Sequence, residues 1–254
     1  MRRMMILLTA LACLLAGCGR EEPAQPTLPP PETNPYTAED FAYEGERLTC
    51  LAGTGVPGID VSSHQGEIDW AAVAADGVEF AMIRVGYRTY LDGKITPDAC
   101  ARANLEGALA AGLDVGVYFF SQALTAEEAA REAAFAVSFI EGYGVTMPVV
   151  FDWEHVTDPD ARTAGMYDMA LLTECAGAFL GVVEAAGYEG MVYFNTYQAR
   201  ELLELRALKD HDFWLAMYDA PMTFPWQIRM WQYSDHGTVA GIHGNVDLNL
   251  YFPG

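Results

Sequence analysis

The chain has 254 residues, of which 52% are hydrophobic and 19% charged, and its formal net charge is −21. Nucleic acids are polyanions and repel a chain this acidic, so we exclude nucleic acid as a partner. Solubility explains the acidity on its own, and a substrate with few charges is compatible with it.

Residues 1–17 are organised like a secretory signal peptide. A short basic end with Arg2 and Arg3 precedes an apolar core that is too short for an ordinary spanning helix. The run Leu15-Ala16-Gly17-Cys18 resembles the bacterial lipobox, in which the cysteine is acylated and becomes the mature N-terminus. We therefore expect an extracytoplasmic lipoprotein, anchored through Cys18 at the cell surface or in the periplasm. A plain signal peptide with an incidental cysteine is the alternative.

Residues 18–56 are expected to form the lipidated cysteine and a flexible linker. The first part, to about residue 43, is rich in Pro, Glu and Thr and has no apolar period that could bury a face. Residues 57–254 have a size that forms one α/β barrel or a comparable single domain, and we expect a monomer.

The folded domain is left with an odd set of cysteines, because Cys13 lies in the signal core and Cys18 is the lipidation site. Cys50, Cys100 and Cys175 lack close metal-ligand spacing, so we predict no zinc site and no complete disulfide framework. One disulfide between two of these three cysteines, with the third as a buried free thiol, is the possibility that the sequence leaves open. Cys175 lies in an apolar helical run, which predicts a small core residue.

Short apolar segments alternate with helix-forming segments along the domain. Strands are predicted over residues 58–62, 80–87, 115–121, 149–154, 191–195, 213–218, 230–233 and 244–250, and helices over 68–75, 99–111, 126–143 and 164–186. Gly112 and Gly187 follow helical patterns and are predicted to end them in the left-handed conformation. This order predicts an α/β fold, a modified TIM-like barrel of βα units followed by strands without helices.

The fourth strand segment, Met147-Pro148-Val149-Val150-Phe151-Asp152-Trp153-Glu154, ends in two carboxylates one residue apart. The side-chain period of a strand points Asp152 and Glu154 to the same side. Two like charges on one face are unfavourable unless one carboxyl is protonated or a ligand needs both. Because the sites of such barrels lie at the carboxyl ends of the strands, the pair is a candidate acid/base site.

Two further carboxylates, Asp60 and Asp247, lie within strand segments, where a lone Asp is costly to bury. Each alone is equally well explained as a turn cap, but together with Asp152 and Glu154 they favour one shared cavity. Such carboxylates suggest glycoside hydrolysis, with retaining and inverting geometries both open.

Aromatic and amide side chains recur at the strand positions of this domain. Most strand aromatics are core residues, yet their density beside carboxylates suits a carbohydrate groove, because sugar rings stack and sugar hydroxyls bond amides. The candidate substrate-binding residues are Tyr87, Tyr118, Tyr193, Trp214, Trp231 and Gln232.

Four motifs together resemble glycoside hydrolase family 25, the Chalaropsis-type lysozymes. They are Asp60-Val61-Ser62-Ser63-His64-Gln65-Gly66, Asp152-Trp153-Glu154, Trp231-Gln232-Tyr233 and Val246-Asp247-Leu248-Asn249. The resemblance implies a modified barrel that cleaves the β-1,4 bond between N-acetylmuramic acid and N-acetylglucosamine, with the peptidoglycan glycan strand as partner.

The same resemblance implies a role for each carboxylate. Glu154 would be the general acid/base, and Asp152 would position or charge-stabilise the acetamido group of the substrate. Asp60 and Asp247 would complete an acidic floor that raises the pKa of Glu154. It implies no metal and no cofactor. The alternatives are a non-catalytic glycan-binding lipoprotein and a hydrolase of chitin-like N-acetylglucosamine polymers.

Overall fold

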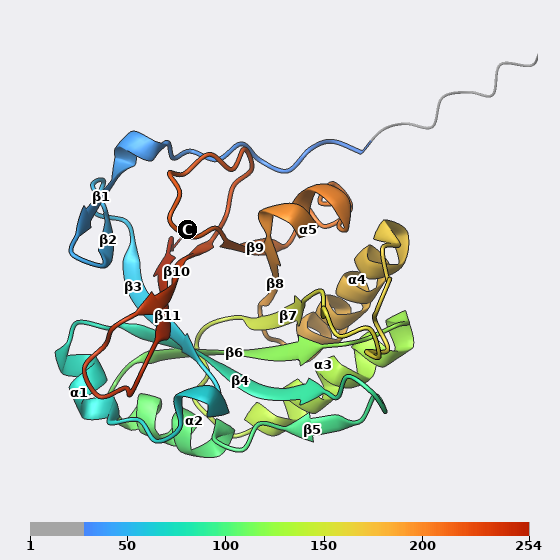
Figure 1. Cartoon of the computed structure of the whole chain (residues 1–254), viewed down its shortest axis with the longest axis horizontal. Coiled ribbons are helices and arrows are strands. Elements are labelled where there is room, and N and C mark those ends of the chain that lie inside the picture. The colour runs from blue at the N-terminus through green and yellow to red at the C-terminus, as the bar shows by residue number, and fades with distance from the viewer. Residues whose placement is uncertain (1–27, 254) are drawn as a thin grey trace, which may run out of the picture.

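The computed structural model describes residues 28–253, and eight strands of this part close into a barrel (Figure 1). In sheet order they are β3 (Val56–Val61), β11 (Val246–Tyr251), β10 (Met230–Gly237), β9 (Asp212–Ala216), β8 (Gly190–Asn195), β7 (Val149–Trp153), β6 (Asp114–Ser121) and β4 (Phe80–Arg88). Pairing of β3 with β4 completes the closure. The predicted modified barrel is confirmed.

Strand directions decide which residues meet at the rim of the barrel. All neighbours from β3 through β4, β6, β7, β8 and β9 to β10 are parallel. Only β11 in this part of the chain runs antiparallel to both of its neighbours. The amino end of β11 therefore lies at the same rim as the carboxyl ends of the others, and Asp247 stands directly opposite Asp60.

Helices cover the outer face of the first five barrel strands along the chain. They are α1 (Trp70–Ala75), α2 (Ala101–Ala110), α3 (Ala126–Ile140), α4 (Met169–Ala185) and the short α5 (Thr196–Glu201). Gly112 and Gly187 have φ angles of 84° and 87°, as the predicted helix stops require. The short strand β5 (Ile95–Pro97) pairs with the end of β4 and was not predicted. No helix follows β9 or β10 in residues 212–253, as expected.

The N-terminal segment covers the side of the barrel that lacks helices. It crosses the β9–β10 loop, with Thr33 bridging Trp226, and then forms the hairpin of β1 (Phe41–Glu44) and β2 (Arg47–Cys50) (Figure 1). The Phe41 ring packs edge-on against Trp231 of β10, at a centroid distance of 5.1 Å.

The expected linker over residues 18–56 is therefore corrected for its later part, which belongs to the folded domain. The physical reason is that the outer faces of β10 and β11 are apolar and need a cover other than a helix. Residues 1–27, which include the predicted signal peptide and Cys18, lie outside the described residues.

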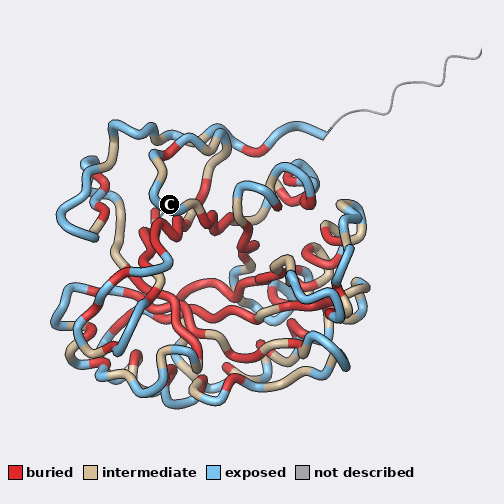
Figure 2. The backbone as a smooth tube through the Cα atoms, in the orientation of Figure 1, coloured by how far each residue is buried: buried red, intermediate tan, exposed pale blue. Residues whose placement is uncertain are grey.

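The barrel interior is apolar at one end and polar at the other. The end at the amino ends of the parallel strands is filled by a cluster that includes Phe80, Met82, Val150, Met191 and Met230. A second, larger cluster lies between the strands and their outer cover. The strands are accordingly the most continuously buried part of the backbone (Figure 2). The interior cluster closes the barrel at the amino ends of the parallel strands. A cavity can therefore form only at their carboxyl ends.

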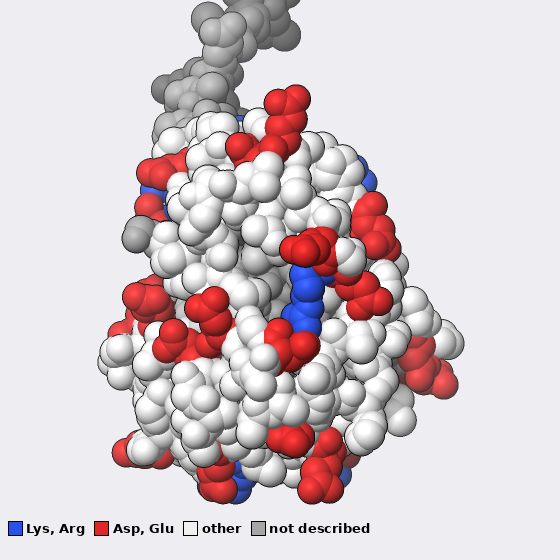
Figure 3. All heavy atoms as spheres, turned by 90° about the vertical axis from the view of Figure 1, so that its left-hand side faces the viewer, with Lys and Arg blue, Asp and Glu red and all other residues white. Residues whose placement is uncertain are grey.

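The remaining whole-molecule features concern thiols, membrane spans and charge. Cys50 and Cys175 are buried free thiols and Cys100 is a half-buried one, so Cys175 is the predicted core residue. Among residues 28–253 no helix has the length and apolar character to cross a bilayer. Acidic side chains are scattered over the face seen in Figure 3 with few basic ones between them, as the net charge requires.

Candidate active site

A cavity of about 270 Å³ opens at the carboxyl ends of the barrel strands. All four predicted carboxylates line it: Asp60 from β3, Asp152 from β7, Glu154 directly after β7, and Asp247 from β11. Trp153, which lies between two of them, is buried on the outer side of the strand. The predicted alternation along this strand is therefore confirmed, and the barrel closure brings the carboxylates of three strands together.

Asp60 and Asp247 form a hydrogen-bonded carboxyl pair at the floor of the cavity. Asp60 Oδ2 accepts hydrogen bonds from Gln232 Nε2 at 2.7 Å and from Asn249 Nδ2 at 2.8 Å. These donors favour an ionised Asp60, although burial raises its pKa. Burial, the charge of Asp60 and the bond to Asp60 raise the pKa of Asp247 from 3.8 to about 9. The pair therefore holds one proton at neutral pH, which the two carboxyls share.

Asp152 and Glu154 have little compensation for their burial. Burial first, and then the charge of Glu154, raises the pKa of Asp152 well above its usual range. Burial and the charge of Asp60 also raise the pKa of Glu154. Among the described residues, Asp152 Oδ1 is buried and has no hydrogen-bond partner. The site thus offers carboxyls whose raised pKa favours the protonated form and a free buried acceptor, which suits general acid catalysis.

An aromatic wall with fixed hydrogen bonds flanks the carboxylates. Trp214 Nε1 donates to Asn249 Oδ1 at 2.9 Å, and the Tyr193 ring stands edge-on to Trp214 with centroids 5.0 Å apart. The hydroxyls of Tyr193 and Tyr218 donate to Gln232 Oε1 at 2.9 and 2.6 Å. Because its carbonyl is held in this way, the Gln232 amide N–H points at Asp60. The wall therefore sets the orientation of the acidic floor.

The aromatic residues predicted to bind substrate lie in three places: the cavity, a groove beside it, and the outer side of β10. Tyr118, Tyr193 and Trp214 line the cavity, as does Gln232. Tyr87 lines an adjoining groove of about 310 Å³, which shares His64, Arg84, Tyr90 and Phe120 with the cavity.

Trp231 does not reach the cavity and corrects the sequence-based expectation. It is 1% exposed, packs on the outer side of β10, and its indole N–H donates to Met217 O at 2.8 Å. Neighbours on a strand point to opposite faces, so Gln232 and Trp231 do not both face the barrel interior.

The sequence of this chain matches the model of one protein family. A model described as glycosyl hydrolases family 25 matches residues 59–242, which is most of the barrel. The chain belongs to this family. The predicted membership of a glycoside hydrolase family is confirmed.

Two relatives of this family 25 chain carry lysozyme names. It is 28% identical to Lysozyme M1 of Streptomyces globisporus over 255 residues, which cover 90% of this chain and 83% of that protein. It is also 28% identical to the autolytic lysozyme of Clostridium acetobutylicum over 198 residues, covering 78% of this chain and 56% of that protein.

Solved structures share the fold. The bacterial lysozyme of Streptomyces coelicolor matches with a TM-score of 0.62 and 26% identity, covering 78% of this chain and 93% of that one. The modular autolysin LytC of Streptococcus pneumoniae, solved with a synthetic peptidoglycan ligand, matches with a TM-score of 0.70 and 21% identity. That match covers 84% of this chain but 52% of the autolysin, so this chain spans about half of its length.

Several residues of this family 25 site were not predicted from the sequence, among them Arg84, Asn249, Tyr90 and Tyr218. Arg84 lines both the cavity and the groove, and its guanidinium is paired with Asp98 at 2.8 Å. A cation in the middle of an otherwise apolar strand segment was the available signal. Asn249 lies two residues after Asp247, on the same face of β11, so alternation alone indicates it. Tyr90 lies in the β4–β5 turn and has no comparable signal.

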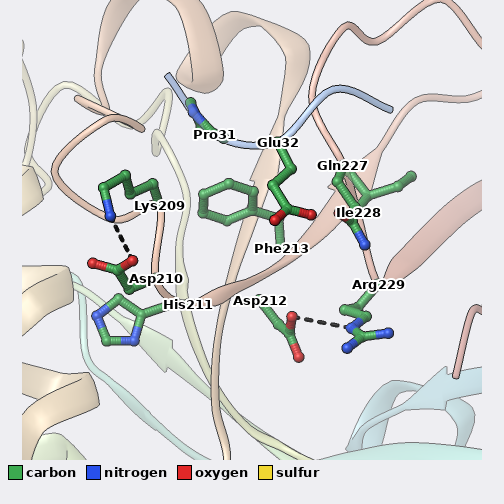
Figure 4. A pocket seen from close by; sticks show the side chains of 10 residues that line it. All are labelled: Pro31, Glu32, Lys209, Asp210, His211, Asp212, Phe213, Gln227, Ile228 and Arg229. Atoms are coloured by element: carbon green, nitrogen blue, oxygen red, sulfur yellow. Dashed lines mark hydrogen bonds and ion pairs between the residues drawn. The ribbon is translucent and has the colours of Figure 1, made fainter. Parts of the chain in front are cut away.

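A second cavity, of about 190 Å³, lies at the amino ends of β9 and β10, away from the catalytic rim (Figure 4). Its cations are neutralised by neighbours, because Lys209 pairs with Asp210 and Arg229 with Asp212. Glu32 reaches it from the N-terminal segment. No group of three or more metal-ligating side chains occurs in residues 28–253 that is arranged to hold an ion.

Proposed function

We propose that this family 25 glycoside hydrolase is a muramidase that cleaves the β-1,4 bond between N-acetylmuramic acid and N-acetylglucosamine in peptidoglycan. The observation that carries the proposal is the convergence of Asp60, Asp152, Glu154 and Asp247 in one cavity with aromatic walls. The lysozyme names of its relatives and the peptidoglycan ligand of the pneumococcal autolysin support the same substrate.

Glu154 is the general acid/base of the proposed reaction. Its burial and the charge of Asp60 raise its pKa, which favours the protonated form that donates to the leaving sugar oxygen. After the glycosidic bond breaks, the Glu154 carboxylate takes a proton from the attacking water and returns to its starting state.

Asp152 acts on the acetamido group of the bound sugar. Its unpartnered Oδ1 accepts a hydrogen bond from the acetamido N–H, which turns the acetamido oxygen toward the anomeric carbon. That oxygen then stabilises the positive charge that develops on the anomeric carbon. Asp60 and Asp247, held by Gln232 and Asn249, keep one negative charge beneath this centre.

The glycan strand lies along the cavity and the adjoining groove. Tyr118 and Tyr193, which are 8% and 7% exposed, offer ring edges to the sugars at the centre, and the buried Trp214 supports them from behind. Gln232 supplies the amide that orders the floor. Tyr87 serves the neighbouring groove, where Tyr90 is an additional exposed ring.

We further propose that the enzyme acts outside the cytoplasm as a membrane-anchored lipoprotein, acylated on Cys18. The lipobox-like run supports this, as does the position of the N-terminal segment. Pro31 and Glu32 line the cavity at the amino ends of β9 and β10, so the tether enters opposite the catalytic rim. Cys18→Ser is expected to move the folded enzyme from the membrane fraction to the soluble one. Membrane retention of that variant would refute acylation of Cys18.

The test of the reaction is digestion of purified peptidoglycan, with mass spectrometry of the new reducing ends. Muramic acid at these ends is expected from wild-type protein. Glu154→Gln is expected to lower turnover by about 10²- to 10⁴-fold, since it removes the transferable proton but keeps the shape.

The matched control is Glu174→Gln, an exposed site on α4, with wild-type turnover expected. Cleavage with N-acetylglucosamine at the new reducing ends would indicate a chitin-type hydrolase. Binding without cleavage by folded wild-type protein would leave only a glycan-binding lipoprotein.

A further inference from the structure

Glu154 lies just past the point where strand β7 leaves the sheet. The pairing of β7 with β6 ends at Trp153, opposite Ser121, and its pairing with β8 ends at Asp152, opposite Tyr193. The ladder therefore does not hold the backbone of Glu154. Buried carbonyls at such a strand end need other hydrogen-bond partners, and those partners decide where the next side chain points.

The first partner is Gln122, which directly follows β6 and is 0% exposed. Its amide Nε2 donates to Glu154 O at 3.2 Å and to Ser121 O at 2.9 Å. The orientation of this amide is itself fixed, because Gln122 Oε1 accepts a hydrogen bond from the buried Thr163 hydroxyl. Arg162 Nη1 also donates to the backbone carbonyl of Gln122, at 3.2 Å. Arg162 and Thr163, in the loop that follows Glu154, therefore fix the orientation of Gln122, which in turn holds the backbone of Glu154.

The second partner is Gln198, which comes from the other side of β7. It lies in the first turn of α5, just after β8, and is 1% exposed. Its amide Nε2 donates to Trp153 O, and its Oε1 accepts from the backbone N–H of Asn195 at 2.9 Å. The last two carbonyls of this segment are therefore held from both neighbouring strands, each by a carboxamide whose other end is engaged.

We propose that Gln122 and Gln198 are positioning residues that aim the Glu154 carboxyl at the glycosidic oxygen. This inference rests on the proposed role of Glu154. Neither glutamine lines the cavity, so their action passes through the backbone of residues 153 and 154. We call Gln122 and Gln198, with their hydrogen bonds to the carbonyls of residues 153 and 154, the clamp. A misplacement of a reacting group by about 1 Å costs on the order of 10²-fold in rate, so the clamp affects catalysis by fixing the position of Glu154.

The clamp has a matched pair of variants in Thr163, which is buried and orients Gln122 through its hydroxyl. Thr163→Val removes the hydroxyl without changing the shape, whereas Thr163→Ser keeps it. Turnover of Thr163→Val is expected to fall about 10-fold with KM within threefold of wild type, and Thr163→Ser is expected to restore most of it.

Gln122→Met removes the amide at constant length and is expected to lower kcat about 10- to 100-fold, again with KM nearly unchanged. Gln227→Met, at the opposite end of the barrel, is the control and keeps wild-type kinetics. The basic limb of the kcat–pH profile is also expected to move to lower pH in Gln122→Met. A Glu154 carboxyl that swings toward water loses the burial that raises its pKa.

The outcomes separate the clamp from the reaction itself. Wild-type protein that releases no new reducing ends overturns the proposed function. Active wild-type protein together with unchanged kcat and pH profile in Gln122→Met and Thr163→Val overturns the clamp alone. If Gln122→Met fails to fold, as judged by circular dichroism, the Thr163 pair decides: equal kcat in Thr163→Val and Thr163→Ser overturns the clamp.

Discussion

The proton shared by Asp60 and Asp247 makes the stability of the enzyme depend on pH, and Asp247→Asn should remove most of that dependence. Asp247 has a pKa of about 9 in the folded chain, against an ordinary value of 3.8. Between these two values the folded state holds a proton that the unfolded state has lost. Unfolding therefore releases a proton, and the free energy of unfolding falls as pH rises through this window.

The magnitude follows from the linkage relation. Each pH unit inside the window lowers the free energy of unfolding by up to about 1.4 kcal/mol. From pH 5 to pH 7 this amounts to about 3 kcal/mol at most, and sharing of the proton with Asp60 reduces the expectation to about 2 kcal/mol. An asparagine at position 247 cannot ionise but still donates an N–H to Asp60. We expect the free energy of unfolding of Asp247→Asn, relative to wild type, to rise by about 2 kcal/mol between pH 5 and pH 7.

Urea titrations followed by tryptophan fluorescence at pH 5, 6, 7 and 8 measure this difference. The stability difference between the two proteins should be smallest at pH 5 and shift steadily in favour of the variant above it. Asp160→Asn, at an exposed position in the β7–α4 loop, is the control and should follow wild type at every pH. If Asp247→Asn were less stable than wild type at pH 7 and kept the wild-type slope, Asp247 would be ionised in the folded protein and the reasoning would fail.

Three further substitutions test the cover, the core and the groove. Phe41→Ala should lower the free energy of unfolding by about 2 kcal/mol, because it uncovers Trp231; an unchanged urea midpoint would show that the hairpin contributes nothing. Arg88→Met should cost about 3–5 kcal/mol by leaving the buried Glu132 carboxylate unpaired, and a loss below about 1 kcal/mol would contradict that ion pair. Tyr90→Ala should raise KM for glycan strands several-fold with stability within about 0.5 kcal/mol, as its ring is 44% exposed; an unchanged KM would remove it from the groove.

Local patterns were sufficient for the strands and for part of the site. The alternation over 147–154 placed Asp152 and Glu154 on one face, and the same alternation already indicates Asn249 beside Asp247. The helix stops at Gly112 and Gly187 were also predictable, because only the residues around each glycine decide them.

The N-terminal segment shows where such patterns end. Its few apolar residues have no period of their own, since they fit a surface made by distant strands. Phe41 is ordered because β10 offers Trp231 and no helix covers that side. The spare apolar area of the barrel, and not the composition of residues 28–50, therefore decides that this part of the expected linker is folded.

The sequence by itself determined the order of the barrel strands and of the four longer helices, the barrel class and the four carboxylates, because each depends on side-chain periods and on short motifs. Only the tertiary structure decided that Gln232 faces the cavity while Trp231 faces outward, since alternation separates the two neighbours without saying which side is the interior. It also decided that Gln122 and Gln198 hold the end of β7. Contacts between residues 32 and 45 positions apart depend on barrel closure, which no local pattern encodes.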